Sequence, residues 1–268
     1  MARRWTKAEE GRFRAELRQL YVVQNKSIKE VGELLGISDK AVYDRLIRLD
    51  IKTQRHKKAG YNKQRHDIRF PQRSKTFAEF LGTMLGDGHV SHFQVIVTLG
   101  TKEVSYVHHV AQCMGALFGV KAKTLFRKTG YRDVYINSVA LTCWLKTQGL
   151  VSNKVREQVG APKWIFKKPT YMKAFLRGFF DTDGSIYCLK FGIQISLTNH
   201  SLPLLHDLRI MLKMLGYKPS EISLFRVYLT QRTEVERFFK EIAPANTKHQ
   251  TRFRKFMRRS DSGNSRRL

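Results

Sequence analysis

Apolar residues recur at helical spacing in three successive stretches near the start of the chain. The first, over residues 6–23, aligns Phe13, Leu17, Leu20 and Tyr21 with Trp5, which directly precedes it. The second starts after Ser27, which forms a capping-box pattern with Glu30, and ends at Gly36. Its apolar face comprises Ile28, Val31, Leu34 and Leu35. The third starts after Ser38 and turns Ala41, Val42, Leu46 and Leu49 inward. We therefore predict a small all-α helix-turn-helix domain over residues 1–51.

The last of these helices is the candidate for contact with DNA. Its exposed start would reach bases through Lys40, Tyr43 and Asp44, while Arg45 and Arg48 would lie near phosphates. The alternative is an ordinary three-helix bundle that binds nothing. The strong positive charge of the chain favours DNA.

Residues 52–75 have the composition of a basic linker. They contain nine Lys and Arg residues against one acid, together with Gly60 and Pro71. Such a run cannot bury itself, so we expect phosphate contacts from Arg55, Lys57 and Lys58. A solvated tether is the alternative.

From residue 77 onward, one pattern of apolar and polar positions occurs twice. Each copy begins with an apolar helix that ends in Asp-Gly, at residues 80–88 and 175–184. Strands then alternate with helices at residues 93–98, 104–118, 133–137 and 140–148, and again at 191–197, 202–215, 224–229 and 235–242. Repetition of this length predicts an α+β fold of two pseudo-symmetric αββαββα units. We place them at residues 76–160 and 161–258, with a flexible basic tail at 259–268.

Composition narrows the class of partner. The net charge is +28, which indicates a polyanion such as nucleic acid, and aromatic residues make up 11% of the chain, too many for a disordered basic tail. No apolar run has the length of a membrane span, so we expect no membrane partner. The three cysteines are widely spaced, which favours reduced core residues in an intracellular protein.

The two Asp-Gly helices carry the candidate chemistry. Small residues four apart, Gly82 and Gly86 in one helix and Gly178 and Thr182 in the other, would let the backbones approach closely. The carboxylates that follow, Asp87 and Asp183, would then lie side by side and repel each other unless a cation sits between them. Paired carboxylates are typical ligands of Mg²⁺ at a phosphodiester.

A single Asp-Gly could merely end a helix, but two copies at matched positions favour the metal site. Asp181 lies two residues before Asp183, and Leu85 occupies its place in the first copy. We therefore assign Asp181 a secondary structural role.

These residues resemble the LAGLIDADG homing endonucleases, in the single-chain form with two motif copies, over about residues 77–257. The second copy, Leu-Arg-Gly-Phe-Phe-Asp-Thr-Asp-Gly at residues 176–184, is close to the family pattern, whereas the first has Leu85 where an acid is often found. The resemblance implies that Asp87 and Asp183 bind the metal ions, helped by the carbonyls of Gly86 and Thr182. It also implies a saddle of antiparallel strands over the major groove.

The family places a lysine near each active centre, late in each half. Lys154 follows Asp87 by 67 residues and Lys248 follows Asp183 by 65, so these two match. We expect them to be catalytic-site lysines that stabilise charge, although plain phosphate binding is the alternative. Strand-end residues that could position the water are Thr98, Thr198 and Asn199.

Base-reading residues should project from one face of the strands. The candidates are Gln94, Arg132, Tyr135, Lys190, Gln194, Arg226 and Tyr228. A register error would flip every side chain, so alternation removes at least half of this set.

The function expected is site-specific, metal-dependent cleavage of both strands of a long asymmetric DNA site, with short 3′ overhangs, by an intron-encoded monomer. Two or three Mg²⁺ ions would serve, with Mn²⁺ or Ca²⁺ substituting in binding. The alternatives are a non-catalytic transcriptional regulator and a maturase that binds its own intron RNA. We do not expect an intein, because the chain starts with Met and ends without His-Asn.

Overall fold

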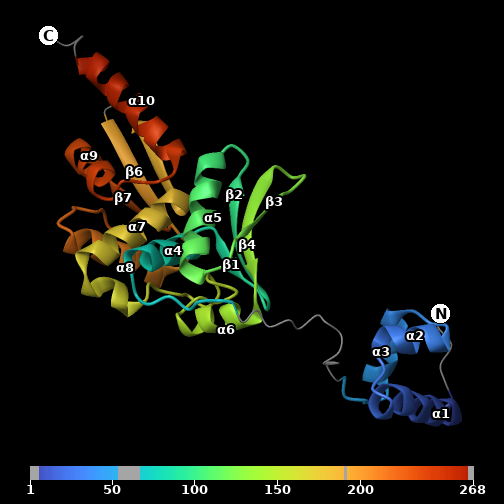
Figure 1. Cartoon of the computed structure of the whole chain (residues 1–268). Helices are drawn as coiled ribbons and strands as arrows, with labels where there is room; N and C mark the ends of the chain where they lie inside the picture. Colours follow the sequence, from blue (N-terminus) through green and yellow to red (C-terminus); the bar gives the residue numbers. More distant parts are fainter. Residues whose placement is uncertain (1–5, 54–66, 190–191, 265–268) are drawn as a thin grey trace. The chain divides into compact units, whose positions relative to one another are not determined.

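The computed structural model describes residues 6–53, 67–189 and 192–264. The chain divides into two compact units, residues 1–63 and residues 64–268, each with its own hydrophobic core (Figure 1). Helices and two antiparallel sheets make up the described part, which confirms the predicted α+β class.

Within residues 6–53, helices surround a small apolar core. They are α1 (Lys7–Leu17), the π-helical segment η1 (Arg18–Val23), α2 (Ile28–Leu35) and α3 (Asp39–Arg48). Ser27 and Glu30 form the predicted capping box, and Gly36 ends α2 at φ 62°, which glycine adopts without strain. The prediction that Leu34 faces the core is wrong, because 58% of this residue is exposed.

The first half of the second unit contains one four-stranded sheet. Its elements are α4 (Lys75–Leu85), β1 (Gly88–Val90), β2 (Gln94–Gly100), α5 (Val104–Phe118), β3 (Lys123–Phe126), β4 (Tyr131–Asn137) and α6 (Val139–Thr147). The strands are antiparallel in the order β1-β2-β4-β3. Alternate residues of β2 and β4, such as Val97 and its partner Val134, are buried against the helices.

The second half repeats the helix-strand order with a smaller sheet. Its elements are the 3₁₀ segment η2 (Lys163–Lys167), α7 (Pro169–Asp183), β5 (Gly184–Leu189), β6 (Gly192–Thr198), α8 (Leu202–Met214), β7 (Arg226–Leu229), α9 (Arg232–Glu241) and α10 (Thr247–Asn264). The described strands pair in the order β5-β6-β7. Where the first half has β3, the described residues of the second half have an isolated bridge that joins Ser223 to Arg226. The αββαββα order thus describes the first half, and the second half departs from it.

Two predicted boundaries also shift. Ile68 packs against the core and the Arg69 N–H donates to the Phe118 carbonyl at 2.8 Å, so the predicted linker ends before residue 75. At the other end α10 continues to Asn264, so the tail predicted at 259–268 is helical over its first residues. Of the linker candidates, Arg55, Lys57 and Lys58 lie outside the described residues.

Helices α4 and α7 cross at the centre of the second unit (Figure 1). A Cβ atom on Gly82 would collide with the Phe175 carbonyl, and one on Gly178 would collide with the Glu79 carbonyl. Because the glycines leave this space free, the two backbones touch directly, and one continuous core spans both halves.

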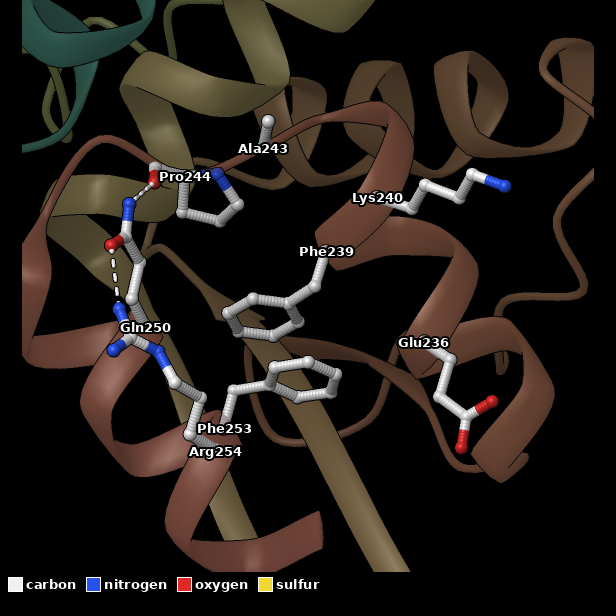
Figure 2. A pocket seen from close by; sticks show the side chains of 8 residues that line it. All are labelled: Glu236, Phe239, Lys240, Ala243, Pro244, Gln250, Phe253 and Arg254. Carbon is white, nitrogen blue, oxygen red and sulfur yellow. Dashed lines mark hydrogen bonds between the residues drawn. The ribbon is translucent and has the colours of Figure 1, made fainter.

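Stacked aromatic rings hold α10 against α9 (Figure 2). Phe253 of α10 lies flat on Phe239 of α9, with ring centroids 4.1 Å apart and planes 4° from parallel. The Gln250 amide donates to the Pro244 carbonyl at 2.7 Å, which ties the start of α10 to the loop before it. These contacts fix the start of α10, which carries Lys248.

No helix among the described residues is long and apolar enough to cross a membrane. The cysteine prediction is wrong for Cys143 and Cys188, which are exposed, whereas Cys113 is half-buried.

Candidate active site at the crossing of the central helices

Asp87 and Asp183 stand at the junctions between the central helices and the strands that follow them. Asp87 comes just after α4 and before β1, and Asp183 ends α7 directly before β5. The helix crossing brings the two junctions together: a Cβ atom on Gly86 would collide with the Thr182 hydroxyl and lie 3.6 Å from Asp183 Cγ. The two carboxylates therefore share one small region, as the matched motifs predict.

The charges of the two acids are coupled. Desolvation, reinforced by the Asp183 carboxylate, raises the pKa of Asp87 to about 6, although its side chain keeps contact with solvent. Burial also raises the pKa of Asp183, against a hydrogen bond from the Asn199 amide to Asp183 Oδ2 at 3.0 Å. Both acids are thus harder to ionise than usual unless a positive charge joins them.

The charge of Lys154 interacts with both carboxylates. Its Nζ donates to the Met84 carbonyl at 3.0 Å and to the Gly86 carbonyl, which anchors the ammonium at the end of α4. Burial lowers the pKa of Lys154, while Asp183 and Asp87 pull it upward. An amine held so close to both acids can act on the same phosphate group as they do.

Lys248 is held differently, by an acid from the other half. Its Nζ lies 2.6 Å from Oε1 of Glu103, the residue just before α5. Glu103 also accepts hydrogen bonds from the Asn246 amide at 2.9 Å and from the Gly100 N–H at 2.8 Å. Burial opposes them, but these bonds keep the pKa of Glu103 below its ordinary value. Both charges act on the pKa of Asp87: that of Glu103 raises it, and that of Lys248 lowers it.

The Asp181 side chain binds backbone N–H groups. It is 1% exposed and accepts the N–H groups of Ala245 and Asn246 at 2.8 and 3.0 Å. Burial raises the pKa of Asp181 to about 7, and the two N–H donors oppose this rise. These two hydrogen bonds hold the loop that leads into α10, the helix that carries Lys248.

Sequence reasoning missed Glu103 and Asn246. A signal for Glu103 exists: it follows Asp87 by 16 residues, and Asn199 follows Asp183 by 16. Of the predicted water-positioning residues, Asn199 contacts Asp183, while the Thr98 hydroxyl donates to Asp133 Oδ1 at 2.8 Å. An Asn does precede each matched lysine, Asn153 before Lys154 and Asn246 before Lys248, but this pattern does not show that the Asn246 side chain bonds to Glu103 and Asp181, both distant in the sequence.

The strand register shows on which face of the first sheet each base-reading candidate lies. Gln94 pairs with Asn137 on the face of the first sheet turned away from the core, and its amide donates to the Asn137 side chain at 2.9 Å. Arg132 pairs with the buried Leu99, so it projects from the opposite face, near the Phe126 ring. The structure therefore separates Arg132 from Gln94.

In the second sheet, Gln194 and Arg226 share the outer face. Gln194 pairs with Tyr187, and Arg226 pairs with Thr198 further along β6. Lys190 lies outside the described residues. The outer face thus keeps Gln194 and Arg226 as candidates.

In the first unit, Lys40 and Tyr43 are exposed on α3. Arg45 makes a cation–π contact within the unit instead, because its guanidinium lies 5.2 Å from the centre of the Phe13 ring. Arg48 contacts Glu10 Oε1 at 2.8 Å. Lys40 and Tyr43 are therefore better placed for an external ligand than the two arginines.

The donor set fits a hard cation. Two ionised carboxylates this close repel, and Mg²⁺ or a similar ion between them would relieve the repulsion. Among the residues that the structure describes, no group of three or more His, Cys, Asp or Glu could hold a metal ion, so further ligands would come from backbone, water and substrate. The Gly86 carbonyl already accepts from Lys154, and the Thr182 hydroxyl donates to the carbonyls of Gly178 and Phe179.

Comparison with known proteins gives one family match. A model described as LAGLIDADG-like domain matches residues 170–243, from α7 to just beyond α9. Among curated proteins, the replication factor C small subunit of Methanocaldococcus jannaschii is 31% identical over 114 residues. That stretch is 42% of this chain but only 6% of the relative, so the match concerns a small part of a much longer protein.

Solved structures of LAGLIDADG proteins show a distant likeness. The N-terminal LAGLIDADG domain of WhiA has a TM-score of 0.47 at 16% identity, covering 65% of this chain and 83% of that one. The homing endonuclease I-DmoI, in complex with DNA and Mn, has a TM-score of 0.45 at 18% identity, covering 63% and 96%. A double mutant of I-SmaMI has a TM-score of 0.48 at 10% identity, covering 73% and 93%.

Proposed function

We propose, from the premise that residues 170–243 form a LAGLIDADG-like domain, that this chain is a site-specific DNA endonuclease that makes metal-dependent double-strand breaks. The observation that supports this most is the convergence of Asp87 and Asp183 at the ends of α4 and α7. Each pseudo-symmetric half contributes one carboxylate, so the pair could act on the two antiparallel strands of a DNA duplex. The net charge of +28 suits a DNA substrate.

The residues around the carboxylates have distinct tasks in this proposal. Asp87 and Asp183 would hold Mg²⁺, which when bound supplies Lewis-acid polarisation of the phosphodiester and a more acidic water. Lys154, anchored on the carbonyls of Met84 and Gly86, would stabilise negative charge on the phosphate beside both acids. Lys248, held by Glu103, would do so on the Asp87 side.

Contacts to the rest of the site would come from two surfaces. The outer faces of the sheets, with Gln94, Gln194 and Arg226, would lie over the major groove. Lys40 and Tyr43 of the first unit would add a second contact through α3. We propose Mg²⁺ as the working ion, and a monomer as the active form.

The test is cleavage of a randomised duplex library in Mg²⁺ by the wild type, Asp87→Asn, Asp183→Asn and the control Glu241→Gln. The control removes the Glu241 carboxylate at the end of α9, which pairs with Arg237 and with Lys173, ten residues before Asp183 on α7. We expect the wild type and the control to cut both strands. Each Asp variant should be slower by ~100-fold or more, since ligand loss removes several kcal/mol of charge stabilisation.

Other outcomes would contradict the proposal in specific ways. Tight, metal-independent DNA binding without cutting by the wild type would indicate a transcriptional regulator. Preferential binding of structured intron RNA would indicate a maturase.

A further inference from the structure

A two-residue turn in the second half carries bulky apolar side chains in a strained backbone. Ser223 and Arg226 exchange two backbone hydrogen bonds of 3.0 and 2.9 Å, which close the turn around Leu224 and Phe225. Both central residues have positive φ, 46° for Leu224 and 59° for Phe225. Turns of this kind favour Asn-Gly, because a branched or bulky side chain crowds the left-handed backbone.

Folding gives no reason for a leucine at this position. Leu224 is 85% exposed, more than any other large apolar residue that the structure describes, so it gains no burial in return for the strain. Phe225 is 43% exposed, and its ring centre lies 4.9 Å from that of His200. The corresponding turn in the first half gives its positive φ, 84°, to Gly130. In the first half, glycine takes the positive φ without strain, whereas in the second half Leu224 and Phe225 take it with strain.

The strained turn is joined to the candidate active site through one residue. The Asn199 N–H donates to the Phe225 carbonyl at 3.1 Å, and the Asn199 amide donates to Asp183 Oδ2 at 3.0 Å. The exposed Arg226 follows the turn on the outer face of β7. Through Asn199 the turn is thus joined to the Asp183 carboxylate, and a cationic side chain directly follows its apolar tip.

We propose that Leu224 is a wedge that enters a DNA groove beside Asp183 and unstacks one base step there. The inference rests on the proposed function and adds to it a residue, Leu224, that deforms the DNA substrate. Apolar side chains that enter between base steps kink the duplex at the point of entry. Backbone strain persists where function uses it. A tip of two residues is far too small for a protein interface, which needs about 800 Å² on each partner.

Unstacking can be read by a fluorescent base. A duplex is first selected from a randomised pool by binding in Ca²⁺, so that recovery does not depend on cutting. The adenine analogue 2-aminopurine, which brightens when unstacked, is then placed at successive steps of that duplex. The variants are Leu224→Asn, which suits positive φ, Leu224→Met, which keeps an apolar tip, and the control Lys128→Asn, in the first-half turn.

We expect one step to brighten at least twofold with the wild type, Leu224→Met and Lys128→Asn. Leu224→Asn should lose this signal and cut at least tenfold more slowly in Mg²⁺, while its melting temperature stays equal or rises. Loss of function in a variant that is not destabilised separates a wedge from a structural role.

Four results would overturn the inference, the last of them together with the proposed function. One is an undiminished signal and rate in Leu224→Asn, and another is equal loss in Leu224→Asn and Leu224→Met, which would assign the effect to turn shape. The third is failure of the wild type to brighten any step. A wild type that brightens a step in Ca²⁺ but never cuts in Mg²⁺ would contradict the endonuclease and keep the wedge. A wild type that binds no duplex would overturn both.

Discussion

Asp181 and Asp183 stand two residues apart on α7, and their surroundings give them different tasks. The Asp183 carboxylate reaches the junction with β5, where it meets Asn199 and Lys154. One half-turn earlier, Asp181 is enclosed and uses both oxygens on the backbone of Ala245 and Asn246. The position of each side chain on the helix decides which is a partly exposed candidate metal ligand and which is a buried acceptor for backbone N–H groups.

The buried carboxyl makes stability depend on pH. The folded pKa of Asp181, about 7, lies above its ordinary value of 3.8, so the folded state holds a proton that the unfolded chain releases. Its contribution to stability is therefore full below about pH 4 and is lost as pH rises through 7. Asp181→Asn cannot titrate, so the stability of the wild type relative to Asp181→Asn should fall with rising pH.

The measurement is urea unfolding of wild type and Asp181→Asn between pH 5 and 8. We expect their difference in unfolding free energy to change by up to about 1.4 kcal/mol per pH unit and to level off above pH 8. A difference independent of pH would mean that the carboxyl stays ionised on its two N–H donors.

Between elements, the start of α10 is coupled to the start of α5. Glu103 takes three donors, from Gly100, Asn246 and Lys248, and the Ser105 hydroxyl lies 3.0 Å from that of Thr247. Loops from the two halves thus meet beside Asp87. This contact, with the Phe239–Phe253 stack at the other side of α10, sets where Lys248 lies.

Glu103→Gln should weaken that coupling. An amide must turn its NH₂ group toward one of the three donors, which leaves a half-buried donor unpaired and costs about 1–3 kcal/mol. Chemical unfolding measures the loss, and the double variant with Lys248→Met should show non-additivity of at least about 0.5 kcal/mol. The matched control Glu241→Gln breaks surface ion pairs and should stay within about 1 kcal/mol of the wild type. Additive effects would show that Glu103 and Lys248 act independently.

At the scale of the whole molecule, two units with separate cores share one strongly basic chain. The second unit holds both carboxylates, and the first holds the exposed Lys40 and Tyr43. We expect a chain of residues 64–268 to keep metal-dependent cutting but to bind DNA more weakly. Log affinity should also fall less steeply with log salt, by about 0.9 for every phosphate that the first unit no longer neutralises.

Fluorescence anisotropy between 50 and 200 mM salt (about the range over which phosphate contacts dominate) measures this difference. The double variant Lys40→Ala, Tyr43→Ala in the full chain is the matched control and should reproduce part of the loss. Equal affinity and slope for the full and shortened chains would make the first unit a bundle without DNA contact.

Local and repeated features of this protein are determined by its sequence alone. The capping box at Ser27 and Glu30 formed as predicted, because a cap depends on residues three apart. Comparison of the two copies singled out Asp87 and Asp183 and set Asp181 apart, because pseudo-symmetry aligns the residues that share a role. Charge alone indicated a polyanionic partner.

The tertiary structure alone decided which distant groups meet. It paired Lys248 with Glu103, placed Arg132 on the face opposite Gln94, and replaced an expected strand start with the strained turn at Leu224. None of these follows from spacing, because long-range contacts and strand register depend on how whole elements pack and not on a residue's neighbours in the chain.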